Sequence, residues 1–98
     1  MSAVEFAHIT SVPGQGDKFE EQLIKSLEVI NESPQNHEIV VYRCIENPDQ
    51  FRLLVTWDSV EAHLAWRDGE GRARYRAFID DLLAGPIEVS HFTEVARK

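Results

Sequence analysis

The segment Phe51-Arg-Leu-Leu-Val-Thr-Trp-Asp-Ser-Val-Glu-Ala-His-Leu-Ala-Trp66 decides how this chain folds and where it can hold another molecule. Large apolar residues alternate up to Trp57, which is the pattern of a strand. Ser59 is a residue type that begins helices, and the helix that follows carries an imidazole, His63, and a second indole, Trp66. An apolar strand followed by such a helix is one way for a small domain to form a pocket for a flat organic molecule.

Strand and helix patterns continue on the N-terminal side of this segment. Residues 3–12 alternate loosely and predict a strand. A helix follows, with Asp17 as its expected cap. Residues 38–46 are rich in β-branched side chains and predict a strand that pairs, through a turn at 47–50, with the strand at 51–57. The apolar face of the first helix is formed by Phe19, Leu23, Leu27 and Ile30.

The C-terminal half contains two helical runs and a last strand. The helix that begins after Ser59 is interrupted at residues 68–71, where two glycines occur. The second run ends at Gly85-Pro86, and residues 87–95 alternate as a strand. One face of the second run is formed by Tyr75, Phe78, Ile79, Leu82 and Leu83.

The order β-α-β-β-α-β predicts an α+β, ferredoxin-like fold, with helices on one face of a four-stranded antiparallel sheet. Residues 1–98 are expected to form a single domain, since the chain has no room for a second one. The strands carry bulky residues at both parities, such as Val40 and Val41. The face without helices would therefore expose roughly several hundred Å² of apolar surface. We expect a second copy to cover it, which gives a homodimer.

The composition limits the possible partners of the chain. Ten Lys and Arg residues against seventeen Asp and Glu residues give a net charge of −7, which disfavours binding to nucleic acid or to acidic membranes. There is no charged and apolar leader and no apolar run of about 18 residues, so we expect a cytoplasmic protein. Cys44 is the only cysteine and is expected to be a small buried side chain. No residue spacing typical of a metal site occurs, so no metal is expected.

Several features together resemble one family. These are Val12-Pro13-Gly14 followed by Phe19 and Leu23, the hairpin into Trp57-Asp58-Ser59, Glu61-Ala62 leading to Trp66, Tyr75, Phe78, Leu82-Leu83 and His91-Phe92. Over nearly its whole length, the chain resembles the antibiotic biosynthesis monooxygenase (ABM) domain. This resemblance implies small ferredoxin-like chains that pair into a dimeric α+β barrel. Members resembling this chain include oxygenases of polyketide aromatics and quinols, and haem-degrading enzymes.

Neither branch of the family has its full residue set in this chain. The haem-degrading branch uses Asn, Trp and His where this chain has Ala7, Trp66 and Arg76. Arginine stays protonated and cannot replace the axial imidazole, so haem degradation is disfavoured. The quinol-type branch often has His at the position of Trp66 and another at Gly71.

The resemblance implies an oxidoreductase: a cofactor-independent monooxygenase acting on a small aromatic, quinol or polyketide-like substrate. Side chains alone do not activate dioxygen, so without a cofactor the substrate must be its own reductant. The alternative is a non-catalytic dimeric domain that binds a hydrophobic metabolite or a partner.

The candidate catalytic residues are His63 and Arg76. His63 lies three residues before Trp66, so the two share a helix face, and an imidazole can act as a general base near neutral pH. A histidine that faces solvent is the alternative. Arg76 could hold a phenolate or enolate anion, but its spacing from Arg72 also fits a solvated helix face.

Trp66 leads the candidate substrate-binding residues, because its indole could stack on a planar substrate, although packing in the core is the alternative. Tyr75 and Tyr42 are expected at the pocket or its rim. His8 and His91 lie in different strands and could point to the same face of the sheet.

Overall fold

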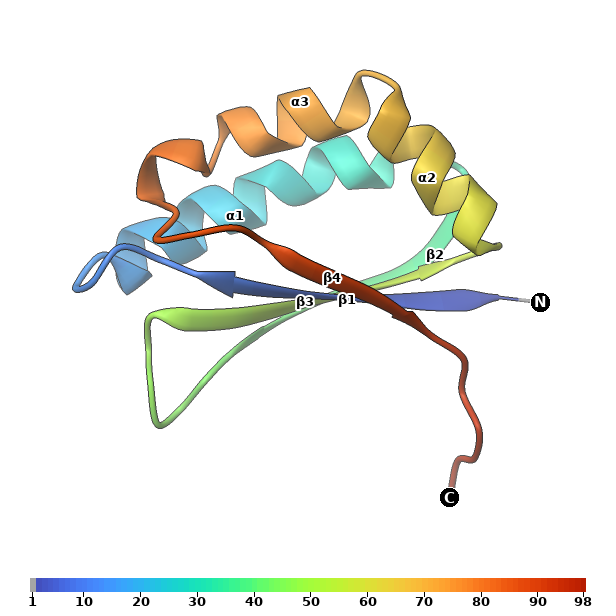
Figure 1. Ribbon diagram of the computed structural model, residues 1–98, viewed down its shortest axis with the longest axis horizontal. Helices are drawn as coiled ribbons and strands as arrows, with labels where there is room; N and C mark the ends of the chain where they lie inside the picture. Colours follow the sequence, from blue (N-terminus) through green and yellow to red (C-terminus); the bar gives the residue numbers. More distant parts are fainter. Residues whose placement is uncertain (1) are drawn as a thin grey trace.

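The computed structural model describes residues 2–98, and Met1, the first residue of the expected domain, lies outside the described part (Figure 1). The elements are β1 (Ala3–Thr10), α1 (Gly16–Asn31), β2 (Asn36–Arg43), β3 (Gln50–Trp57), α2 (Val60–Asp68), α3 (Gly71–Ala77), the 3₁₀ turn η1 (Asp80–Leu82) and β4 (Glu88–Phe92). The strands form one antiparallel sheet in the order β2-β3-β1-β4. The helices all lie on one face of this sheet (Figure 1). The predicted α+β, ferredoxin-like fold is therefore confirmed.

Several element ends differ from the sequence prediction for local reasons. Strand β1 ends at Thr10: the Ser11 amide still donates to the carbonyl of Asp49, but the Val12 amide donates to the carbonyl of Leu82 and not to β3. Helix α1 begins at Gly16 after the N-cap Gln15, so Asp17 lies in the first turn and was wrongly predicted as the cap.

Three later elements are also shorter than their patterns indicated. Helix α3 ends at Ala77, and only the 3₁₀ turn η1 continues the expected second run. Strand β2 spans residues 36–43 instead of 38–46, and β4 spans 88–92 instead of 87–95. The cap of α2 is confirmed, since the Ser59 hydroxyl accepts a hydrogen bond of 3.1 Å from the Ala62 amide.

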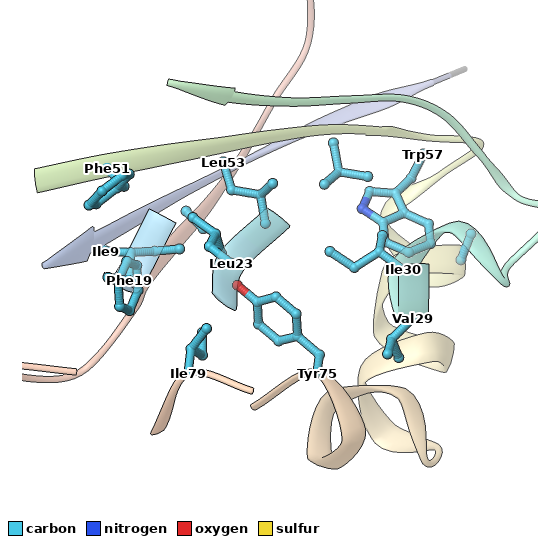
Figure 2. Packing of buried hydrophobic residues seen from close by; sticks show 13 residues of the cluster. Ile9, Phe19, Leu23, Val29, Ile30, Phe51, Leu53, Trp57, Tyr75 and Ile79 are labelled. Atoms are coloured by element: carbon cyan, nitrogen blue, oxygen red, sulfur yellow. The ribbon is translucent and has the colours of Figure 1, made fainter. Parts of the chain in front are cut away.

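The hydrophobic core lies between the sheet and the helices, and it uses the odd-numbered residues of β1 and β3. Phe51, Leu53, Val55 and Trp57 of β3 are all at most 2% exposed. Helix α1 packs its apolar stripe against them. Tyr75 of α3 and Ile79, two residues after its end, close the core beside α1 (Figure 2). The even-numbered residues of β1 lie on the opposite face.

The second face of the sheet carries apolar side chains that no helix of residues 2–98 covers (Figure 1). Val4, Phe6 and Leu54 are half-buried there, and the ring of Phe6 meets that of Phe92 edge-on at 5.3 Å between centroids. Phe92 is 54% exposed. The expected apolar second face is therefore present. None of the helices in residues 2–98 is long and apolar enough to cross a membrane.

Neighbouring residues of α1 provide a matched test of this core. Leu23 is completely buried, whereas Ile24 is 54% exposed. Leu23→Ala should lower the free energy of unfolding by about 2–5 kcal/mol, since it leaves a cavity. Ile24→Ala should change it by less than about 0.5 kcal/mol. Urea denaturation followed by circular dichroism measures both, and similar losses for the two variants would contradict the packing described here.

Candidate functional site

A cavity of about 440 Å³ lies between the helices α2 and α3 and the helix-facing side of β1 and β4. Its apolar floor includes Ala7 of β1 and Val89 of β4. The aromatic side chains of Trp66 and Tyr75 border it from the helices. Its charged rim is formed by Arg67, Asp68, Arg72 and Arg76.

Trp66 is the centre of a cluster of rings on the helical side of this cavity. Its ring lies 5.9 Å from that of Trp57, 6.0 Å from that of Tyr75 and 6.2 Å from that of His63, between centroids. Its indole Nε1 donates to the carbonyl of Val29 at 3.4 Å. The indole also packs on the backbone of Gly71, where any Cβ would overlap it. The indole is therefore held in place by four elements.

A buried acid–imidazole pair forms one wall of the cavity. Glu5 of β1 is 6% exposed and His63 of α2 is 3% exposed. The Glu5 Oε1 atom accepts a hydrogen bond of 2.9 Å from Trp57 Nε1 and lies 3.3 Å from His63 Nε2. On its other side, His63 Nδ1 lies 2.7 Å from His91 Nε2. The ring of His63 stacks on that of Trp57 at 5.1 Å.

Burial changes the proton affinity of both members of this pair. Burial raises the pKa of Glu5 above its ordinary value, and the hydrogen bond from Trp57 opposes this only in part. Burial, together with the neighbouring His91 and Arg67, lowers the pKa of His63 to about 4. His63 is therefore neutral at neutral pH.

The proton positions follow from this neutrality. A neutral imidazole has one N–H and one lone pair, and a carboxylate only accepts. We therefore assign the proton of His63 to Nε2, which faces the Glu5 carboxylate at 3.3 Å, and let Nδ1 accept from His91 Nε2. Both ring nitrogens of His63 are then used inside the protein.

Tyr75 and Arg76 differ in what they offer to a ligand. The Tyr75 hydroxyl is buried and has no hydrogen-bond partner within residues 2–98, and it points toward the sheet near Leu23 (Figure 2). Burial and the nearby charge of Glu5 raise the pKa of Tyr75, so the hydroxyl stays protonated. Arg76 is half-buried at the cavity rim, where its Nε donates to Asp80 at 2.6 Å.

The structure brings together four of the predicted site residues: His63, Trp66, Tyr75 and Arg76 all line the cavity. Ala7, one of the positions compared with the haem-degrading branch, lines it too.

The three other predicted site residues lie outside this cavity lining. His91 contacts His63 from behind, because it is paired with Glu5 across β1 and β4. His8 and Tyr42 lie on the face without helices, on either side of Arg52, where they line a second hollow of about 410 Å³. His8 and His91 therefore point to opposite faces of the sheet.

The model of the antibiotic biosynthesis monooxygenase family matches residues 3–79. The chain belongs to this family. A Bordetella bronchiseptica structure, provisionally named as an antibiotic biosynthesis monooxygenase, is 25% identical to this ABM chain and has a TM-score of 0.90. The match covers 97% of this chain and 98% of that one.

More distant structures share the fold of this ABM chain. SnoaB from Streptomyces nogalater, described as a cofactor-independent oxygenase, has a TM-score of 0.84 at 14% identity, covering 98% of this chain and 95% of its own. A Chloroflexus aurantiacus structure, with the same provisional name as the Bordetella one, has a TM-score of 0.78 at 22% identity, covering 100% of this chain and 97% of its own. No curated protein matches the chain.

Glu5 is the site residue that sequence reasoning missed in this ABM chain. The loose alternation of residues 3–12 did not indicate which row of this strand faces the helices, so Glu5 was not singled out. The available signal was its neighbours, since Ala3, Ala7 and Ile9 share its parity and are all buried. A charged residue within an apolar row often marks a functional site.

The lowered pKa of His63 predicts a pH-dependent stability. Between pH 6.5 and about 4, the unfolded chain protonates His63 while the native chain does not, so the free energy of unfolding should fall as the pH falls. The loss from this group amounts to about 2–3 kcal/mol. Glu5 contributes with the opposite sign, because its raised pKa favours proton binding by the native state.

Variants separate the part that comes from His63. Urea denaturation at a series of pH values should show a weaker loss of stability toward low pH in His63→Gln than in the unaltered protein. His37→Gln, which changes an exposed histidine paired with Asp58, should keep the part of the dependence that comes from His63. An unchanged dependence in His63→Gln would show that His63 is not held neutral.

Proposed function

We propose that this ABM chain is a cofactor-independent monooxygenase acting on a small aromatic, quinol or polyketide-like molecule bound in the cavity beside Trp66. The observation that carries the proposal is the buried Glu5–His63 pair at the wall of that cavity. Family membership and the likeness to SnoaB, described as a cofactor-independent oxygenase, also support it.

The chemistry needs a base and a dry site more than it needs a cofactor. Removing the proton of a phenol gives an electron-rich anion that can transfer electrons to dioxygen. A 1,4-dihydroxynaphthalene would give 2-hydroxy-1,4-naphthoquinone and water: the O–O bond breaks, one oxygen forms a C–O bond on the ring, and the other leaves as water. The substrate supplies all four electrons, and no other reductant is required.

The cavity matches such a substrate in size and lining. Its volume of about 440 Å³ lies within the range of small-molecule sites. Trp66 offers a flat surface for stacking, and Ala7 and Val89 form an apolar floor that excludes water. Arg76, already oriented by Asp80, would face the anion that forms on deprotonation.

The Glu5–His63 pair would take up the proton of the substrate. His63 is neutral and in contact with Glu5, so it contributes as part of the pair and not as a separate base. Tyr75 keeps its own proton, and because its hydroxyl is enclosed in the core, it would act as a wall of the cavity.

We also propose that two copies pair through the face without helices. Val4, Phe6, Leu54 and Phe92 give this face an apolar centre that a second sheet would bury. His8 and Tyr42 would then lie at or near the interface, away from the cavity beside Trp66.

Oxygen consumption tests the proposed activity. The protein with 1,4-dihydroxynaphthalene should consume oxygen well above the uncatalysed rate, and isotopically labelled dioxygen should leave one label in the quinone product. Trp66→Ala, which removes the stacking surface, should lower kcat/KM by at least about tenfold, given roughly 1.4 kcal/mol per factor of ten. Ile24→Ala, on the exposed side of α1, is the control.

Two outcomes would count against the enzyme. A rate equal to the uncatalysed one across a panel of quinols and polyphenols would remove the proposed activity. Thermal stabilisation by the same compounds without turnover would favour the non-catalytic binding domain instead.

Sedimentation velocity tests the proposed dimer. The protein should sediment as a dimer at micromolar concentration. Leu54→Lys should shift it to a single subunit, because a charge at the centre of the sheet face would be buried without a partner. Ile24→Lys should remain dimeric. A single subunit in the unaltered protein would contradict the proposal.

A further inference from the structure

We infer that Glu5 is the group that exchanges the proton with the bound phenol, and that His63 and His91 are positioning residues that hold its carboxylate toward the cavity. This inference rests on the proposed function and names the base of the same site. The first observation is that the hydrogen bond from Trp57 and the contact with His63 both reach the same oxygen atom of Glu5.

The bonds of Glu5 leave one carboxylate oxygen available. Oε1 receives Trp57 Nε1 and contacts His63 Nε2. No hydrogen bond to Oε2 is found among residues 2–98. In this part of the chain, the one side-chain polar atom that is fully enclosed and without a partner is the Tyr75 hydroxyl, so Oε2 is not fully enclosed. Oε2 therefore has access to open space, and the open space that Glu5 borders is the cavity.

The other polar groups of the cavity are poor proton acceptors. Nδ1 of His63 is hydrogen-bonded to His91, and its Nε2 is directed at the Glu5 carboxylate, 3.3 Å away. Tyr75 stays protonated, and arginines do not lose their protons. Asp68 is the other carboxylate of the lining, but it is exposed at the rim and bonded to Arg67 at 3.0 Å.

The order of donors explains why His63 and His91 act through Glu5. With the protons assigned above, His91 donates to His63, and the Nε2–H of His63 lies 3.3 Å from Glu5, so both N–H groups are directed toward the carboxylate. Such a chain fixes the side chain of Glu5 and stabilises its charge in a buried place. It also leaves His63 without a free lone pair for the substrate.

The proton balance closes within the cavity. Glu5 takes the phenolic proton at Oε2, which leaves a phenolate and a neutral carboxyl. When the O–O bond breaks, the carboxyl returns that proton to the oxygen that leaves as water, and the second hydrogen of this water also comes from the substrate, which loses two hydrogens overall. No proton has to enter from solvent over the complete reaction.

Proton uptake on binding tests this inference without any turnover. The probe is 4-nitrophenol, at a pH above its own pKa, where it is an anion. Glu5 and the bound phenolate would share one proton, so binding should take up close to one proton per ligand. Calorimetry in buffers of different ionisation heat measures this uptake.

Matched variants identify the group responsible. Glu5→Gln keeps the shape and can still accept the bond from Trp57 at Oε1, but it should bind the probe without proton uptake. Asp68→Asn should keep the uptake, since this carboxylate lies at the rim. Equal uptake in the unaltered protein and in Glu5→Gln would overturn the inference, as would no binding of the probe to the unaltered protein.

A second measurement needs no variant at Glu5. In protein carrying ¹³C-labelled glutamate, one carboxyl resonance should move to the position of a protonated acid when 4-nitrophenol binds. The absence of any such shift would also overturn the inference, even if Glu5→Gln fails to fold.

Kinetics separate the base from the residues that position it. In an active protein, kcat/KM should fall toward low pH as Glu5 becomes protonated; this fall is the acid limb of the pH profile. Glu5→Gln should lower the rate by about 100-fold or more and abolish the acid limb. His91→Phe should move the limb to higher pH, because the carboxylate loses support. An unmoved limb would remove His63 and His91 from their positioning role.

The other charged groups around Glu5 define the background of this pH profile. They are His63 from α2, His91 from β4, Tyr75 and Arg76 from α3, and Arg67, Asp68 and Arg72 at the rim. If proton uptake is found but no quinol is oxidised, the base assignment holds and the proposed activity fails. The reverse result would retain the activity and reject Glu5.

Discussion

The site of this protein depends on the register in which β1 pairs with its two neighbours. Glu5 is paired with Val55 of β3 on one side and with His91 of β4 on the other. Trp57 lies two residues further along β3, on the same face, within reach of the carboxylate. A slip of one residue would turn Glu5 to the opposite face of the sheet and separate its carboxylate from Trp57 and His63.

Helix α2 completes this arrangement because its start is fixed independently of the sheet. The Ser59 cap sets where the helix begins, immediately after Trp57. His63 then falls on the first turns of the helix, stacked on the indole of Trp57 and in contact with Glu5. The same short connection between β3 and α2 therefore supplies two of the groups that hold the acid.

Burying an acid and an imidazole together works against stability, and the structure shows how the cost is limited. Glu5 keeps a hydrogen bond from Trp57, and His63 stays neutral, so the pair is not a buried salt bridge with two desolvated charges. A purely apolar pair would pack at least as well here. The retention of titratable groups beside a cavity is typical of a site where protons are exchanged.

The sequence by itself determined the layout of strands and helices, the Ser59 cap and the two-sided apolar character of the sheet. These follow from local preferences and from periodicity, which act over a few residues. Tertiary structure alone decided which row of β1 faces the helices, because both rows contain apolar residues and alternation does not name the buried one.

That choice of face placed Glu5 inside and His8 outside, and it set His91 behind His63. The site could not be predicted in full because its contacts join residues 28 and 52 positions apart. Only the pairing of strands brings such residues together.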